Sequence, residues 1–256
     1  YCIGFLTYGL YGLTANNKLL SFAITNPNTV TEKSLTGLLV DEKFIGIDYR
    51  FRTSTDNSGK LYGLTNKGNL YTINTDTGLA SLITALRPDT GSTFTNLDGT
   101  SFAVDFNPTA DRLRVVSNTG QNLRINVDTG DTIKDGDING ISEATELFDL
   151  DQTGKTLTKQ NPPNAGTLNL ISNLGINLGI DNGFDIAGGD NGLALATVAG
   201  ETGPSVLYRV DLNSDTTITT PRARLAISVD GTPNLAASTI GANTTPQVID
   251  LAILLK

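Results

Sequence analysis

One unit recurs along the chain of 256 residues: two short strands of alternating apolar residues, joined by a tight turn that carries Asn or Gly. The copies begin at Leu10, Leu61, Leu113, Leu147 and Leu193, which are 51, 52, 34 and 46 residues apart. A period of roughly 40 to 50 residues built from four short strands is typical of a β-propeller blade. No window shows the i, i+3, i+4 apolar spacing of an amphipathic helix. The sequence therefore predicts an all-β chain folded as a β-propeller.

Further strand-like segments complete the repeat. An apolar segment precedes three of the copies, at residues 44–50, 101–107 and 184–187, and another follows two of them, at residues 79–84 and 167–171. Each blade is thus predicted to have an inner strand, two central strands and an outer strand.

The first copy has no inner strand ahead of it, whereas residues 225–229 form a strand-like segment without a blade of its own. Pairing of the N- and C-terminal strands would use both and remove the exposed edge of the ring. We therefore predict five blades closed by these strands. The alternative is six blades, with the last 26 residues forming the extra one.

Two parts of the chain fit this scheme less well. The fourth copy has no room for an inner strand between Gly140 and Leu147, which predicts either a reduced blade or a missing loop. The apolar segments 1–6 and 248–255 lie outside the repeats, so we predict a single domain over residues 1–256 with short N- and C-terminal extensions. These extensions either pack on the flank of the ring or pair with a neighbouring copy, which would make the protein a homo-oligomer.

Composition excludes several classes of function. The chain has no His and one Cys, which excludes a Ser-His-Asp triad, a Cys-His nucleophile, a His-ligated metal and a zinc cluster. A net charge of -8 argues against a nucleic-acid partner, and no run of about 18 apolar residues predicts a membrane span. The single Cys and the many Asn, Thr and Gly residues favour a secreted, extracellular protein.

Residues 135–146 match a calcium-loop pattern. Asp135, Asp137 and Asn139 stand at the spacing of side-chain ligands, Gly140 at the turn, and Glu146 at the position of the closing carboxylate. Because no helix pattern flanks the segment, an acidic surface turn between blades is the favoured interpretation. A site for calcium as a cofactor is the alternative.

A second group of candidate binding residues lies on the predicted inner strands. Asp48, Asp105 and Asp185 hold matching positions, so they are expected to form an acidic ring around the central channel, which could bind a cation or a sugar. Other polar side chains of one inner strand and its hairpin join this group: Asn107, Asp111, Arg112 and Arg114. Paired carboxylates also serve glycoside hydrolysis. The alternative is that the aspartates accept hydrogen bonds from the backbone of neighbouring blades, with Arg50, Arg112 and Arg114 as counterions.

The segment Val104-Asp-Phe-Asn-Pro-Thr-Ala-Asp-Arg-Leu-Arg-Val-Val-Ser-Asn-Thr-Gly-Gln-Asn-Leu-Arg-Ile-Asn-Val-Asp-Thr-Gly130 resembles the central motif of a bacterial family. This family is domain of unknown function 4394, which is frequent in cyanobacteria. Its other landmarks resemble residues 10–14, 46–50, 160–168 and 184–186, in the same order. The resemblance implies export and a propeller-like β fold, and it implies no reaction.

These observations favour a secreted, non-enzymatic β-propeller that acts as a structural or binding protein of the extracellular matrix or cell surface, with self-assembly through the terminal strands. Two alternatives remain open. One is a carbohydrate-active hydrolase or lyase that uses aspartates at the channel mouth, and the other is a glycan-binding module.

Overall fold

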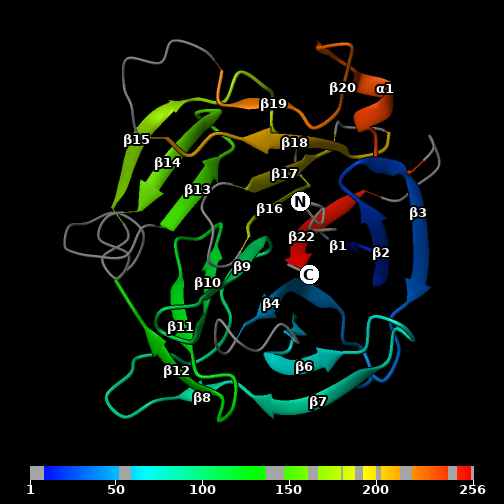
Figure 1. Cartoon of the computed structure of the whole chain (residues 1–256). Helices are drawn as coiled ribbons and strands as arrows, with labels where there is room; N and C mark the ends of the chain where they lie inside the picture. Colours follow the sequence, from blue (N-terminus) through cyan, green and yellow to red (C-terminus); the bar gives the residue numbers. More distant parts are fainter. Residues whose placement is uncertain are drawn as a thin grey trace, which may run out of the picture.

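The computed structural model describes residues 9–51, 59–136, 147–160, 167–179, 181–187, 193–199, 203–213, 221–241 and 247–254. Five of the sheets lie around a common centre. The strands β4, β9, β16 and β22 are each the end of their sheet that lies nearest to this centre (Figure 1). This arrangement confirms the predicted all-β propeller of five blades. No helix among the described residues is long and apolar enough to cross a membrane.

Each blade is a meander numbered here from the N-terminus. Blade 1 contains β22 (Val248–Leu254), β1 (Gly9–Thr14), β2 (Lys18–Ala23) and β3 (Asn26–Ser34). Blade 2 contains β4 (Phe44–Arg50), β5 (Lys60–Thr65), β6 (Asn69–Ile73) and β7 (Ala80–Ala85). Blade 3 contains β9 (Phe102–Asn107), β10 (Arg112–Ser117), β11 (Asn122–Ile125) and β12 (Asp131–Lys134), with β8 (Arg87–Pro88) parallel to β12.

The last two blades complete the ring. Blade 4 contains β13 (Leu147–Asp151), β14 (Thr156–Gln160) and β15 (Leu168–Asn173). Blade 5 contains β16 (Asn182–Ile186), β17 (Ala194–Val198), β18 (Val206–Val210) and β19 (Ala223–Leu225). After them come the two-stranded sheet of β20 (Ser228–Val229) and β21 (Thr232–Pro233), and the short helix α1 (Leu235–Ser238).

The ring closes where β22 pairs antiparallel with β1, with Leu10 opposite Ile253. The two terminal strands therefore close the ring, as predicted, but the closing strand is not residues 225–229. Leu225 ends the outer strand of blade 5, and Ser228 lies in β20. An inner strand packs against neighbouring blades on both faces, so it needs an almost uninterrupted apolar sequence, and β22 has one, with all but one of its residues buried.

This assignment also corrects the predicted C-terminal extension. Residues 248–254 form the inner strand of blade 1 and are hydrogen-bonded within the ring. Pairing of this strand with another copy would require the ring to open. Residues 1–8 lie outside the described residues.

The fourth blade has an inner strand after all. The segment beginning at Leu147 was expected to be the second strand of its blade, yet β13 is the innermost strand and β14 follows it. The short spacing of 34 residues joins Leu113 to Leu147. Leu113 lies in the second strand of blade 3, whereas Leu147 lies in the inner strand of blade 4. The short spacing is therefore explained without a missing strand.

The hydrophobic core is divided among the junctions between blades. The described residues form four buried clusters, which join blades 1 and 2, blades 1 and 5, blades 2 and 3, and blades 4 and 5. Within the described part of the chain, no such cluster joins blades 3 and 4. Side chains of blades 3 and 4, many of them polar, line a cavity instead.

Candidate binding site at the centre of the ring

Every inner strand carries one aspartate between two apolar residues. They are Asp48 on β4, Asp105 on β9, Asp149 on β13, Asp185 on β16 and Asp250 on β22. Asp48, Asp105 and Asp185 are the three predicted from the sequence, whereas Asp149 and Asp250 were not predicted. The signal was present in the triplets Phe-Asp-Leu and Ile-Asp-Leu, but these segments had been assigned to a second strand and to an extension.

The structure brings the three predicted aspartates together. One carboxylate oxygen of each of Asp48, Asp105 and Asp185 lies within 4.8 Å of the others. Oxygen ligands of this kind are those that calcium and magnesium prefer, so these three residues could hold a hard cation.

The ring aspartates also tie neighbouring blades together. Asp48 Oδ2 accepts a hydrogen bond from the backbone N–H of Phe106 at 2.6 Å, and Asp250 Oδ2 accepts one from Ile47 at 2.8 Å. Asp185 Oδ2 accepts one from Ile253 at 2.6 Å. These carboxylates therefore accept hydrogen bonds from the backbone of neighbouring blades, as expected. The hydrogen bonds fix the inner strands relative to one another.

Burial raises the pKa of every ring aspartate because the charged carboxylate loses its hydration. The pKa rises to about 7 for Asp105, where the charge of Asp149 adds to the effect of burial, and to about 6 for Asp149. The pKa values of Asp48, Asp185 and Asp250 lie well above the usual range, chiefly through burial and then through the charges of neighbouring aspartates. The centre of the ring therefore favours the neutral form of these carboxyl groups more than water does.

A cavity of about 540 Å³ opens between blades 3 and 4 and reaches the ring aspartates. We call it the interblade cavity. Its wall combines carboxylates with three phenylalanines, several hydroxyl groups and side-chain amides. The carboxylates are those of Asp105, Asp149, Asp151, Asp185 and Asp250, and the amides are those of Asn118, Gln152, Gln160 and Asn182. Cavities of this size with a few convergent polar groups are typical of small-molecule sites.

Several buried polar atoms of this wall have no hydrogen-bond partner in the part of the chain that the structure describes. They are both amide atoms of Gln160, Oδ2 of Asp149 and Oδ1 of Asn182. Gln160 is 0% exposed. Nothing in the sequence marks Gln160 as a site residue. Whether its amide finds hydrogen-bond partners depends on the residues that the fold packs around it.

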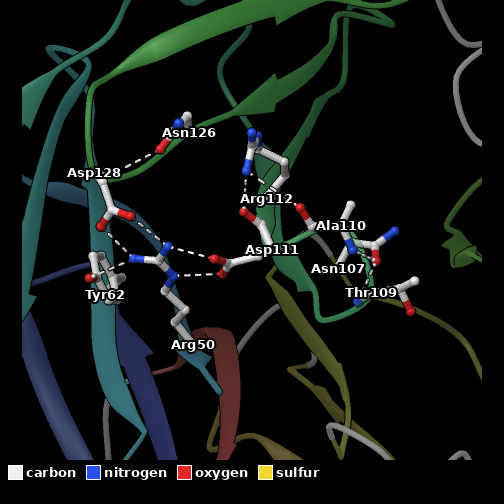
Figure 2. A network of polar contacts seen from close by, with 9 residues as sticks. All are labelled: Arg50, Tyr62, Asn107, Thr109, Ala110, Asp111, Arg112, Asn126 and Asp128. Atoms are coloured by element: carbon white, nitrogen blue, oxygen red, sulfur yellow. Dashed lines mark hydrogen bonds and ion pairs between the residues drawn. The ribbon is translucent and has the colours of Figure 1, made fainter. Parts of the chain in front are cut away.

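Arg50 is the last residue of β4 and joins blade 2 to blade 3. Its guanidinium donates to both carboxylate oxygens of Asp111, at 2.7 and 2.8 Å, and to both of Asp128, at 2.6 and 2.8 Å (Figure 2). It also lies 5.8 Å from the ring centroid of Tyr62. Arg50 was expected to be a counterion of the ring aspartates, but it is held instead by these two carboxylates in the turns of blade 3.

The other residues predicted around Asp105 have separate roles. Asn107 Oδ1 accepts hydrogen bonds from the backbone of Thr109 and Ala110, and Arg112 donates to the carbonyl groups of Ala110 and Asp111 (Figure 2). These contacts shape the hairpin between β9 and β10. Asn107 and Asp111 line a cavity of only about 20 Å³, and neither lines the interblade cavity.

Arg114 lines the interblade cavity and forms an ion pair of 2.6 Å with Asp135. The first residue of the predicted calcium loop is therefore bound to an arginine. Asp137, Asn139 and Glu146 lie outside the described residues. Calcium binding by this loop stays a prediction.

Two solved structures show a distant likeness to the chain. A structural genomics protein of unknown function from Bacteroides thetaiotaomicron is 15% identical with a TM-score of 0.45, over 96% of this chain and 64% of that one. BamB from Moraxella catarrhalis is 12% identical with a TM-score of 0.31, over 80% of this chain and 55% of that one. The chain thus spans less than two thirds of either protein. No curated protein matches it.

A family model gives the identification. It matches residues 18–143 and 138–231, which include four of the five inner strands. The matched residues also contain Asp48, Asp105, Asp149, Asp185 and Gln160. The chain therefore belongs to the family described as domain of unknown function (DUF4394).

Proposed function

We propose that this propeller is a non-enzymatic binding module that takes a saccharide into the interblade cavity. The observation that carries the proposal is the side chain of Gln160, which is 0% exposed, lines the cavity and has neither amide atom hydrogen-bonded among the described residues. A buried amide without partners costs free energy, so a site that retains one is suited to a ligand that supplies both a donor and an acceptor.

A saccharide has the matching chemistry. Each hydroxyl group donates and accepts, so it can bond at once to an amide such as Gln160 and to a carboxylate such as Asp149. The apolar face of a sugar ring suits the side chains of Phe102, Phe148 and Phe184, which line the same cavity. An extracellular location, expected from the composition, belongs to the same proposal because it would give the protein access to matrix polysaccharides.

Gln160→Leu is expected to abolish saccharide binding without lowering the stability of the free protein. Leucine removes the unpaired amide, so the free energy of unfolding should stay equal or rise by about 1 kcal/mol. The measurement is calorimetric titration with xylo-, malto- and cello-oligosaccharides of two to four units, together with urea unfolding of both proteins.

Gln121→Leu is the matched control. Gln121 is also buried, but its amide accepts from the N–H of Asp98 at 3.0 Å and donates to the carbonyl of Asn96 at 2.9 Å, outside the cavity wall. This variant should lose about 1–3 kcal/mol of stability and keep saccharide binding. Equal binding by wild type and Gln160→Leu, or no heat with any oligosaccharide, would refute the proposed function.

A second candidate function, glycoside hydrolysis, is favoured by the carboxyl of Asp105. Its pKa of about 7 suits a general acid, and Asp149 lies close enough to raise that pKa by its charge. Under this alternative, wild type releases reducing ends from the same oligosaccharides. Asp105→Asn would then stop turnover while leaving binding measurable, since asparagine keeps the shape but cannot donate the proton. Binding without any release of reducing ends would leave the module non-enzymatic.

A further inference from the structure

Blade 5 places two arginines directly opposite each other. Arg209 on β18 is the register partner of Arg224 on β19, and both are exposed. Register partners on antiparallel strands project from the same face, so their guanidinium groups repel each other. An arrangement of this kind weakens a sheet unless an anion lies between the two charges.

Blade 3 contains the same arrangement together with its anion. Arg114 on β10 is the register partner of Arg124 on β11. The carboxylate of Asp135 bridges them, with Oδ2 at 2.6 Å from Nη1 of Arg114 and Oδ1 at 3.0 Å from Nη2 of Arg124. In this blade the chain itself supplies the carboxylate that a pair of opposed arginines requires.

The pair in blade 5 has no comparable bridge among the described residues. The carboxylate of Asp211 lies 3.9 Å from Nη2 of Arg224 and 3.9 Å from Nη1 of Arg222. These are contacts at the limit of an ion pair, whereas Asp135 reaches its arginines at hydrogen-bond distance.

Both arginines line a cavity of about 780 Å³, which we call the arginine cavity. The described residues of its wall include three arginines and one carboxylate, in a chain whose net charge is -8. Arg222, the third arginine, is 1% exposed and donates to the carbonyl of Asn213. Phe148, Leu212 and Pro233 supply apolar surface beside the charges.

We propose that the arginine cavity is a second binding site, which takes a small organic carboxylate and holds it between Arg209 and Arg224 as Asp135 is held between Arg114 and Arg124. The site is separate in its chemistry from the saccharide site proposed above and does not depend on it. A sugar acid and an acidic side chain present the same carboxylate. Glucuronate represents the first source and N-acetylaspartate the second in the test below.

The test is calorimetric titration at constant ionic strength with glucuronate, with N-acetylaspartate and with glucose. Wild type should bind at least one of the two carboxylates. Gln160→Leu, in which the proposed saccharide site is removed, should bind glucose at least about 10-fold more weakly than that carboxylate, because charge-assisted hydrogen bonds supply most of the affinity. The tighter of the two carboxylates identifies the source.

Arg209→Gln and Arg224→Gln should each weaken carboxylate binding by about 10-fold or more, while the melting temperature of the free protein stays equal or rises because the repulsion is relieved. Arg124→Gln is the matched control: it removes one member of the bridged pair in blade 3, so it should lower the melting temperature and leave carboxylate binding unchanged. Gln160→Leu, which alters only the proposed saccharide site, should leave N-acetylaspartate binding unchanged. Failure of both carboxylates to bind wild type, or equal binding by wild type and the two blade 5 variants, would overturn the proposal.

Discussion

Leu251→Ala is expected to lower the free energy of unfolding by about 2–5 kcal/mol, because it leaves a cavity in the strand that closes the ring. Leu251 is 1% exposed and lies in the buried cluster that joins blades 1 and 5. Without secure packing of β22, β1 would become an exposed edge and the two ends of the ring would separate. The effect should therefore appear as cooperative unfolding of the whole domain at lower urea concentration.

Leu82→Ala provides the control for this substitution. Leu82 lies on β7, the outer strand of blade 2, and is 51% exposed. The same chemical change there should alter stability by no more than about 0.5 kcal/mol. Equal losses in the two variants would show that β22 does not close the ring in solution, and the C-terminal segment would again be available for pairing with another copy.

The protein is expected to be more stable at pH 5 than at pH 8, by about 2–4 kcal/mol in the free energy of unfolding. The direction follows from the raised pKa of the ring aspartates, which reaches about 7 in Asp105 and about 6 in Asp149. Since these folded-state pKa values exceed those of the unfolded chain, the folded protein binds more protons. The stabilisation is fully present below the unfolded pKa, near 4, and is lost as pH rises through 6 and 7.

The chain is well suited to this measurement because it contains no His, so no histidine titrates between pH 5 and 8. Urea unfolding at pH 5, 6, 7 and 8 gives the profile. Asp105→Asn should flatten it and raise stability at pH 8, since the amide never ionises.

Asp131→Asn serves as the control for the pH profile. Its half-buried carboxyl accepts a hydrogen bond from Arg87, which lowers its pKa, so it is already ionised throughout this range. The variant should therefore keep the slope of wild type. Stability that is constant or increases from pH 5 to pH 8 in wild type would contradict the assignment of buried, proton-binding aspartates.

The repeat predicted the fold class because strand alternation and turn residues are local properties of the sequence. Equivalent strands of a propeller have equivalent positions around the axis, so three aspartates at matching positions could be expected to meet. Asp149 and Asp250 hold the same position, but they can be recognised only when the order of strands within their blades is known. The sequence predicted a second strand at residues 147–151 and an extension at residues 248–254. An apolar strand does not show by itself which strands it will pair with.

The sequence by itself determined the all-β propeller, its five repeats and the acidic character of its inner strands, because each depends on residue type and spacing along the chain. Only the tertiary structure decided that β22 closes the ring, that Arg50 is bound by Asp111 and Asp128, and that Gln160 lies unpaired in a cavity. It also decided that Asp135 bridges one pair of arginines while Arg209 and Arg224 have no such bridge among the described residues. These properties depend on which distant segments pack together, and hydrogen bonding and burial are fixed by that packing.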